Sequence, residues 1–395
     1  MAQTVIERLL VAAGRKLLPQ SFKGQLDLTL PSGEVVVLGG AEPGERADLK
    51  IRNFKVLWSA FRRAQLGFFE RYLAGDVESS DPTAFFRFYL QNRAGMDGAS
   101  RFFMASLFDK IWHRLRDNDH DGARENIAAH YDLGNAFYKL WLDDTMSYSS
   151  AIFNGKANSL EAAQRLKYQR VMEAAEVKPG SRVLEIGCGW GGFAEMVGKA
   201  GASLRGITLS REQLAFATAR MAREGLADQA ELVIEDYRDT DGVFDAIASI
   251  EMIEAVGEPH WPTYFKTIFN RLKPGAAAAI QGITILEDNF PAYRSGVDFI
   301  QRYVFPGGML LTKEIMLEQA QKAGLMLEKI ECFGLSYAET LRQWRVRFEA
   351  AWPRIQPLGF DDRFKRLWTL YLCYCEAGFA EGIIDVGIYK IRKPA

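Results

Sequence analysis

The sequence predicts an α/β protein in which a doubly wound, seven-stranded domain follows a small α+β domain. Two observations lead to this prediction. From about residue 160 onward, short apolar runs of strand-forming residues alternate with stretches of helical periodicity, which is typical of a parallel sheet covered by helices. A glycine-rich turn also follows the first of these runs, as in many doubly wound folds. The expected strands are residues 182–186, 203–208, 230–234, 244–250, 276–285, 327–332 and 383–391, with a turn at 271–275 before the fifth of them.

The first hundred residues predict the small α+β domain. Alternating apolar residues on either side of a Pro- and Gly-containing turn predict a hairpin. This region carries no acid/base cluster, metal-ligand set or phosphate loop, so we expect the chemistry to lie elsewhere in the chain. The expected strands are 25–30, 35–38 and 47–51, and the expected helices are 54–73 and 83–93.

A basic amphipathic helix is expected at residues 101–116, between the two domains. Such a helix either lies on a membrane surface or packs between domains, and the pattern leaves both open. The polar stretch 117–124 follows it. We therefore predict domains at 1–118 and 119–395.

The composition excludes several classes of protein. The 395 residues are 48% hydrophobic and 25% charged, as in an ordinary globular protein, and the net charge of −1 argues against nucleic acid as a partner. No run approaches 18 continuous apolar residues and no signal peptide is recognisable, so we expect a cytoplasmic protein or one at the cytoplasmic membrane face. Aromatic residues reach 12%, which indicates a need for large apolar surfaces.

The four cysteines do not have the spacing of metal ligands. Cys373 and Cys375 lie two residues apart in a helical run, and Cys188 and Cys332 are isolated. We expect buried, unreactive thiols and no metal site.

The glycine-rich turn follows the strand that ends near Ile186. Gly187, Gly189 and Gly192 also satisfy the dinucleotide pattern GxGxxG, so the turn alone does not identify the ligand. A dinucleotide site requires an acidic residue at the end of the second strand, and that strand ends in Thr208, Leu209 and Ser210.

An acid stands instead at Glu185, two residues before the glycines, where it suits the ammonium of an amino acid. The third strand is followed by Asp236 and Tyr237, which suit the amine and the face of an adenine ring. A single nucleoside that carries an amino acid fits both features, so we expect S-adenosylmethionine.

Several motifs resemble the cyclopropane-fatty-acyl-phospholipid synthase family. They occur in the expected order over residues 125–395, and the N-terminal region fits the smaller, lipid-binding domain of that family. The resemblance implies a Rossmann-like methyltransferase domain. The motifs are residues 130–135, 146–151, 183–192, 206–213, 235–239, 253–257, 302–308 and 337–344, and the expected cofactor contacts are Tyr148, Ser149, Glu185, Gly187, Cys188, Gly189, Gly191, Thr208, Leu209, Ser210, Gln213, Asp236, Tyr237 and Ser249.

The resemblance implies methylene transfer from S-adenosylmethionine to a cis double bond in an acyl chain of an unsaturated phospholipid. Methyl transfer leaves a carbocation, which aromatic rings stabilise, and a bound bicarbonate ion then removes a proton as the ring closes. Glu254 and Tyr337 correspond to bicarbonate contacts, Ile283 supplies a backbone contact, Ser150 a main-chain contact, and Gln281 stands where a further anion contact is expected. Peripheral membrane contact is expected, and a homodimer is left open.

Two departures from the family pattern affect the expected product. Gln281 and Ala255 replace histidines, and neither residue carries a proton near neutral pH. Ring closure, a methyl-branched chain and a methylene chain therefore all remain open. Two further possibilities are a methyltransferase for a small soluble acceptor and a catalytically silent lipid-binding protein. Residues 287–325, rich in aromatics, are expected to cover the acyl site.

Overall fold

The computed structural model describes residues 21–100, 133–155 and 159–395. The predicted helix at 101–116, the polar stretch 117–124 and the first part of the motif 130–135 lie outside the described residues. No helix among the described residues is long and apolar enough to cross a membrane.

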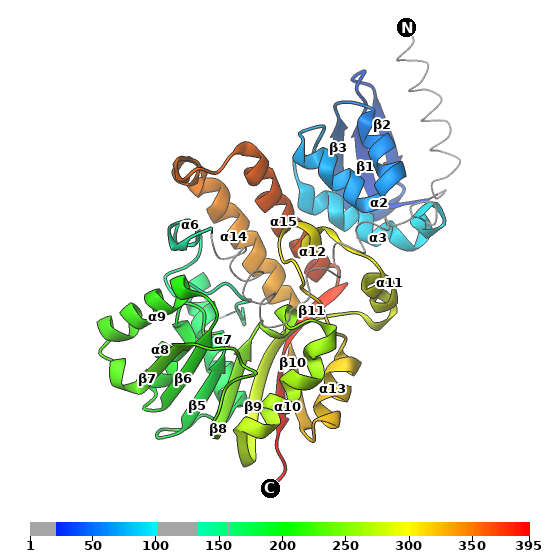
Figure 1. Cartoon of the computed structure of the whole chain (residues 1–395). Helices are drawn as coiled ribbons and strands as arrows, with labels where there is room; N and C mark the ends of the chain where they lie inside the picture. The colour runs from blue at the N-terminus through cyan, green and yellow to red at the C-terminus, as the bar shows by residue number, and fades with distance from the viewer. Residues whose placement is uncertain (1–20, 101–132, 156–158) are drawn as a thin grey trace.

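The N-terminal region forms the predicted α+β arrangement, a sheet with helices beside it, and the sheet has a fourth strand that was not predicted (Figure 1). The first two strands form the expected antiparallel hairpin, and the third pairs in parallel with the first. The third strand begins five residues earlier than predicted, because it continues past the irregular pairing at Gly24. The elements are β1 (Lys23–Thr29), β2 (Val35–Gly39), β3 (Glu42–Ile51), α2 (Lys55–Leu73), β4 (Val77–Glu78) and α3 (Pro82–Ser100).

A seven-stranded sheet forms the second domain, and all seven predicted strands are confirmed. The strand order is β10-β11-β9-β8-β5-β6-β7, in which β11 runs antiparallel to its neighbours and the remaining pairs are parallel. The turn expected at 271–275 is wrong, because β9 already begins at Leu272 with a shifted register opposite Phe244. The strands are β5 (Arg182–Ile186), β6 (Ser203–Thr208), β7 (Ala230–Ile234), β8 (Phe244–Ile250), β9 (Leu272–Ile285), β10 (Met326–Cys332) and β11 (Ile384–Arg392).

Helices cover both faces of this sheet, which confirms the doubly wound architecture. Val183 packs into a core with α7, α8 and α9, whereas its neighbour Leu184 packs into a core with α10 and α13. Successive residues of one strand thus supply opposite faces. The helices are α7 (Leu160–Ala174), α8 (Gly192–Lys199), α9 (Arg211–Arg223), α10 (Trp261–Arg271) and α13 (Lys313–Lys322).

Two long helices, α14 (Gly334–Ile355) and α15 (Asp362–Ala380), join the sheet to the N-terminal domain. Because the antiparallel β11 ends at the bottom of Figure 1, the carboxyl ends of the parallel strands point upward to these helices. Thr83 of α3 donates a hydrogen bond to Glu376 of α15 at 3.2 Å, and Arg87 forms an ion pair with Glu381. Short helices complete the domain: α6 (Asn135–Lys139), α11 (Phe290–Ser295) and α12 (Phe299–Tyr303).

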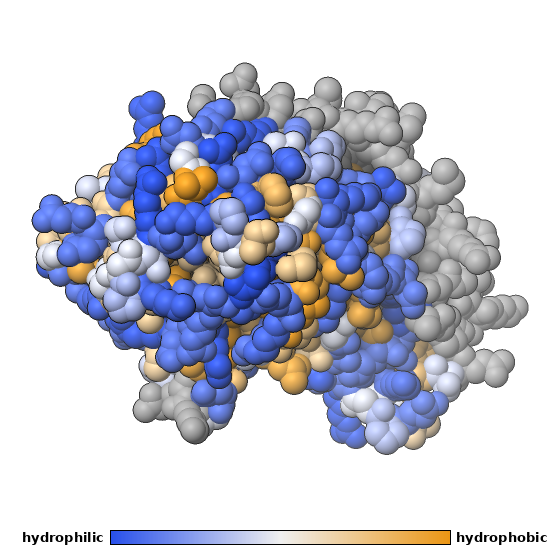
Figure 2. Space-filling model, turned by 90° about the horizontal axis from the view of Figure 1, so that it is seen from below, coloured by the Kyte–Doolittle hydropathy of each residue, from blue (hydrophilic) through white to orange (hydrophobic). Residues whose placement is uncertain are grey.

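The largest apolar core contains much of the aromatic excess seen in the sequence. It runs from the N-terminal sheet through α14 and α15 to the carboxyl ends of the strands. Phe299 of the 287–325 segment lies 4.5 Å, centroid to centroid, from Phe69 of α2. The segment therefore contacts the N-terminal domain. The opposite end of the molecule, seen from below, is mostly hydrophilic, with apolar side chains in small groups (Figure 2).

The cysteines form no disulfide. Cys188 and Cys373 are buried as expected and Cys375 is partly buried, but the expectation is wrong for Cys332. That residue ends the edge strand β10, where no further strand covers it.

Candidate active site

The glycine turn after β5 has a backbone that only glycine adopts readily. Gly187, Gly189 and Gly191 have φ values of 86°, 50° and 80°. A Cβ added at Gly187 would lie 3.2 Å from the Met252 side chain, whereas one added at Gly189 would meet no atom within 4 Å. The turn thus leaves open space at Gly189, at the N-terminal end of α8, where a ligand can approach the backbone.

A pocket lies at this turn, enclosed by the carboxyl ends of β5, β6, β7 and β8 and by residues 146–149. Most of the predicted cofactor residues line it, although they come from separate parts of the chain. They are Tyr148, Ser149, Glu185, Gly187, Cys188, Gly189, Thr208, Leu209, Gln213, Asp236 and Tyr237.

Three residues of the predicted cofactor set stand outside the lining of this pocket. The Ser210 hydroxyl caps α9 by accepting a hydrogen bond from the Gln213 N–H at 3.3 Å. The Ser249 hydroxyl donates to the Ile186 carbonyl at 3.3 Å, and Gly191 packs closely on Ala217. Ser210 and Ser249 thus contact the lining residues Gln213 and Ile186, whereas Gly191 contacts α9.

The third-strand end of the pocket places an acid and a ring beside each other, as expected for an adenine site. Asp236 is buried, and its carboxylate accepts a hydrogen bond from the Arg238 guanidinium at 2.7 Å. Tyr237 packs against Tyr264 with a centroid distance of 5.6 Å. The sequence reasoning missed Arg238, which forms part of the lining and fixes the Asp236 side chain.

Glu185 is the residue best suited to hold the cofactor's ammonium. The side chain is buried, and its Oε2 atom has no hydrogen-bond partner among the described residues. Burial raises the pKa of Glu185 to about 8, against a smaller opposing effect of Lys167. A bound ammonium group would donate a hydrogen bond to the unpartnered Oε2 atom. Its positive charge would also stabilise the buried carboxylate. This orphaned oxygen and the open space at Gly189 fit the S-adenosylmethionine expected from the sequence.

Lys167, which the sequence reasoning missed, lies in the buried surroundings of the same pocket. Its Nζ donates a hydrogen bond to the Ser149 hydroxyl at 2.6 Å. Burial lowers the pKa of Lys167 to about 8, while Glu251, Asp143 and Glu185 raise it. The lysine therefore contributes a buried cation next to Ser149 of the pocket lining, and its charge is partly compensated by these carboxyls.

The five residues expected to surround a bicarbonate ion come together beside this pocket. The Ile283 N–H donates to Glu254 Oε1 at 2.5 Å, while Glu254 Oε2 has no partner among the described residues. Ser150, Gln281 and Tyr337 meet a different group, the carboxylate of Glu251, which the sequence reasoning missed.

Glu251 directly follows β8 and lines the cofactor pocket. Its Oε1 accepts hydrogen bonds of 2.8 Å from the Ser150 N–H and from Gln281 Nε2, and its Oε2 accepts one of 2.6 Å from the Tyr337 hydroxyl. The position of an acid at the carboxyl end of a central strand is the signal that sequence reasoning had available for Glu251.

The two neighbouring carboxyls are not equivalent. Burial, followed by the proximity of Glu251, raises the pKa of Glu254 to about 8. Burial also raises the pKa of Glu251, but Tyr337, Lys167, Ser150 and Gln281 all oppose that effect. Because two buried carboxylates repel each other, the one with more hydrogen-bond donors ionises more readily. Negative charge is therefore better stabilised on Glu251 than on Glu254.

Aromatic rings pack beside these carboxyls. The Tyr337 ring stacks on Phe379 at 4.4 Å and meets Trp344 at 6.1 Å. Tyr148, which lines the cofactor pocket, lies 5.3 Å from Trp344 and shares a 2.9 Å hydrogen bond with Tyr371. Aromatic rings of the kind expected to stabilise a carbocation are therefore present beside the carboxyls.

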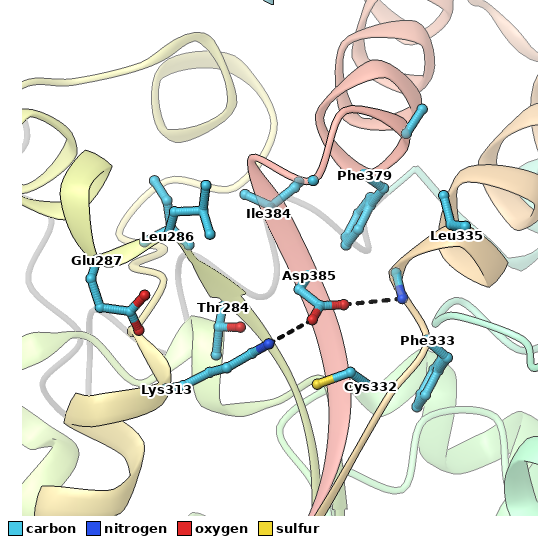
Figure 3. A pocket seen from close by; sticks show the side chains of 14 residues that line it. Thr284, Leu286, Glu287, Lys313, Cys332, Phe333, Leu335, Phe379, Ile384 and Asp385 are labelled. Carbon is cyan, nitrogen blue, oxygen red and sulfur yellow. Dashed lines mark hydrogen bonds and ion pairs between the residues drawn. The ribbon is translucent and has the colours of Figure 1, made fainter.

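A second pocket, shown in Figure 3, is lined in part by Phe379, the ring on which Tyr337 stacks. Asp385 of β11 forms an ion pair with Lys313 at 2.7 Å and accepts a hydrogen bond from the Gly334 N–H at 3.0 Å. Leu286 and Leu335, both exposed, lie at this pocket. None of the predicted site residues lines it, so it is separate from the cofactor pocket.

Comparison with known proteins agrees with this geometry. The family model of mycolic acid cyclopropane synthetase matches residues 118–389. The tuberculostearic acid methyltransferase UfaA1 of Mycobacterium tuberculosis is 39% identical over 333 residues, which cover 82% of this chain and 78% of the relative. The cyclopropane-fatty-acyl-phospholipid synthase of Escherichia coli is 34% identical over 358 residues, or 87% and 86% of the two chains.

Solved structures show the same relationship. The crystal structure of mycolic acid cyclopropane synthase CmaA1 complexed with SAH and CTAB has a TM-score of 0.64 and 27% identity, and covers 68% of this chain and 98% of that chain. Fold, pocket and relatives together define an S-adenosylmethionine-dependent methyltransferase with a Rossmann-like domain. More specifically, the chain belongs to the cyclopropane synthase family of lipid methyltransferases.

Proposed function

We propose that this enzyme transfers a methyl group to the cis double bond of an unsaturated phospholipid acyl chain and that a cyclopropane ring then closes. The observation that carries the proposal is the buried carboxyl pair, which lies beside the cofactor pocket and is walled by aromatic rings. An alkene gives a cation on methylation. A site for that chemistry requires rings that stabilise the cation and a base that removes a proton.

S-adenosylmethionine supplies an electrophilic methyl group when bound. Glu185 would hold the ammonium end, the glycine turn would let the cofactor approach the backbone, and Asp236 with Tyr237 would receive the adenine; all of these residues line the pocket. The buried aromatic walls exclude water, which would otherwise trap the cation as an alcohol. The base that the family resemblance implies is bicarbonate, which Ser150, Glu254, Gln281, Ile283 and Tyr337 would hold.

A second candidate product is a methyl-branched or methylene chain. Two observations favour it: the 39% identity to a protein named tuberculostearic acid methyltransferase, and Gln281 and Ala255 in place of two family histidines. Loss of a proton from a chain carbon next to the charge gives a methyl-branched alkene. A methylene chain forms when a hydride first shifts from the methyl-bearing carbon to the cationic carbon and the methyl group then loses a proton. Both candidate products would form at the same cofactor site and from the same class of acceptor, an unsaturated acyl chain.

We also propose that residues 1–118 present the lipid to the domain at 119–395 and that the enzyme works on the cytoplasmic face of a membrane. The substrate resides in a bilayer, and the basic amphipathic pattern at 101–116 suits anionic lipid surfaces. A homodimer stays a prediction.

The test uses purified enzyme, S-adenosylmethionine and vesicles of a phospholipid with cis-monounsaturated chains. We expect S-adenosylhomocysteine to form and the acyl chain to gain one CH₂, whereas matched vesicles with saturated chains give neither. Ozonolysis of the product separates the candidates, because a cyclopropane chain resists cleavage and an alkene is cut. Equal turnover with saturated vesicles, or none with unsaturated ones, would overturn the proposal.

A further inference from the structure

We infer that the carboxylate of Glu251 is the base that removes the proton from the acyl carbocation, in the place where an external anion was expected. The inference rests on the proposed function and adds a catalytic residue to it. Four features carry it: the backbone of Glu251, its hydrogen bonds, its charge and its position.

The backbone at Glu251 is unfavourable for a side chain. Its φ is 51°, and among the described residues only Met146 and Glu176 are other non-glycine residues with positive φ. Glycine would relieve this conformation and would also avoid burying a carboxyl group. A residue that is costly in both respects, at the edge of a cofactor pocket, indicates a functional reason for its side chain.

The hydrogen bonds show that Glu251 occupies the anion position. The Ser150 N–H, Gln281 Nε2 and the Tyr337 hydroxyl are the donors that a planar anion would use at this site, and all three donate to the Glu251 carboxylate. These donors come from a loop, from β9 and from α14. A bicarbonate ion would have to displace the side chain from this set of donors.

The charges around Glu251 favour its ionised form over that of its neighbour. Lys167 and Tyr337 stabilise the Glu251 carboxylate, whereas Glu254 has one donor and an unpartnered oxygen. Lys167 also lies near Glu185, the carboxyl at the cofactor end of the site. Because three donors serve the Glu251 carboxylate and only one serves Glu254, Glu251 is the member of the pair on which negative charge is better stabilised, and thus the one suited to accept a proton.

The step balances without an added reactant. The acyl cation carries a positive charge on the carbon next to the new C–CH₃ bond. Glu251 takes a proton from that methyl group, and the C–H electron pair forms the third bond of the ring. If the proton comes from a neighbouring chain carbon, the pair forms a double bond and the product is methyl-branched. Glu251 becomes a neutral acid and releases its proton to water after the product leaves.

The deciding experiment measures turnover of purified Glu251→Gln, wild type and Glu176→Gln with unsaturated vesicles. Glu176 shares the positive φ but forms surface ion pairs with Lys390 and Arg392. We expect Glu251→Gln to lose roughly 100-fold or more in kcat, the usual contribution of a general base, while S-adenosylmethionine affinity and melting temperature stay close to wild type. Glu176→Gln should stay within about twofold in kcat, because its side chain lies outside the site.

A second variant keeps the inference testable if Glu251→Gln folds poorly. Glu251→Gly suits the backbone and frees the three donors. In CO₂-depleted buffer we expect it to be inactive, and added sodium bicarbonate should raise its kcat at least tenfold while leaving wild type unchanged. Turnover of Glu251→Gln within threefold of wild type would overturn the inference, as would equal bicarbonate stimulation of wild type and Glu251→Gly. Either result leaves the proposed function standing, whereas a wild-type enzyme that modifies no unsaturated chain removes the proposed function itself.

Discussion

The two ends of the site are built in opposite ways. At the cofactor end, the protein leaves polar groups and space unused: Glu185 Oε2 lacks a partner among the described residues, and Gly189 faces open space. At the base end, Glu251 is saturated by three donors from the protein itself. A buried polar group that the fold leaves unsatisfied indicates a ligand that completes it, whereas a satisfied group indicates that the protein supplies the function.

The contrast separates two carboxyls that occupy similar positions in the fold. Glu185 and Glu251 each stand at the carboxyl end of a neighbouring central strand, and burial raises the pKa of both. Only Glu251 has donors arranged around it. We therefore expect substitutions at the cofactor end to lower cofactor affinity and substitutions at the base end to lower turnover.

The largest expected effect is at the glycine turn. Gly189→Val places a branched side chain in the open space where the cofactor lies, at a φ of 50° that valine disfavours. We expect S-adenosylmethionine affinity to fall by roughly 100-fold or more, as measured by calorimetry. Gly180→Val is the matched control, since Gly180 also has a positive φ and open space but lies in an exposed turn. Equal losses in both variants would mean that backbone strain causes the effect.

Glu185→Gln tests the unsatisfied end directly. The amide keeps the shape but removes the charge that would meet the cofactor's ammonium. We expect S-adenosylmethionine affinity to fall by about 10-fold or more, as for the loss of a hydrogen bond between charged groups. At saturating cofactor, kcat should stay near wild type. A drop in kcat with unchanged cofactor affinity would mean that Glu185 acts in proton removal and not in cofactor binding.

Tyr337→Phe removes one of the three donors to Glu251. We expect kcat to fall by about 10-fold with little change in cofactor affinity. The Tyr337 hydrogen bond lowers the pKa of Glu251, so its loss raises that pKa. Because the base must be ionised, the acidic limb of the kcat–pH profile should move to higher pH. An unshifted limb would indicate that Tyr337 only packs against Phe379.

The smallest effect on turnover is expected for Glu254→Gln. Glu254 holds a proton near neutral pH in this account, so a neutral amide should change kcat by less than about threefold. If an external anion bound at Glu254 were the base, this substitution would instead abolish turnover.

The same variant should change stability with pH. The pKa of Glu254 is raised from 4.5 to about 8 in the fold. Ionisation of this group in the unfolded chain therefore draws the equilibrium toward unfolding as pH rises from 4.5 to 8. Glu254→Gln removes that effect, so its melting temperature should exceed that of wild type by about 2 °C or more at pH 8, with a smaller gain at pH 5. Calorimetric scans at the two pH values measure the difference.

Much of this fold was predictable because its signals are local. The strands at 182–186, 203–208, 230–234 and 244–250 are apolar, short and bounded by turns, and the structure has the same bounds. The start of β9 was not predictable in this way, because Pro274 and Gly275 read as a turn although the strand continues through them with a shifted register.

The site was predictable only in part for a different reason. The resemblance directed attention to Glu254, Tyr337, Gln281, Ile283 and Ser150, and the structure brings these residues together. Which carboxyl they serve depends on how β8, β9 and α14 meet, and on a left-handed backbone at Glu251. Neither property is visible in local sequence.

The most direct test of the central claim is the turnover of wild-type enzyme in CO₂-depleted buffer, with and without added sodium bicarbonate, on vesicles of unsaturated phospholipid. If Glu251 is the base, kcat is the same in both buffers. If turnover collapses without bicarbonate and returns in proportion to its concentration, the base is an external anion and the role assigned to Glu251 is wrong.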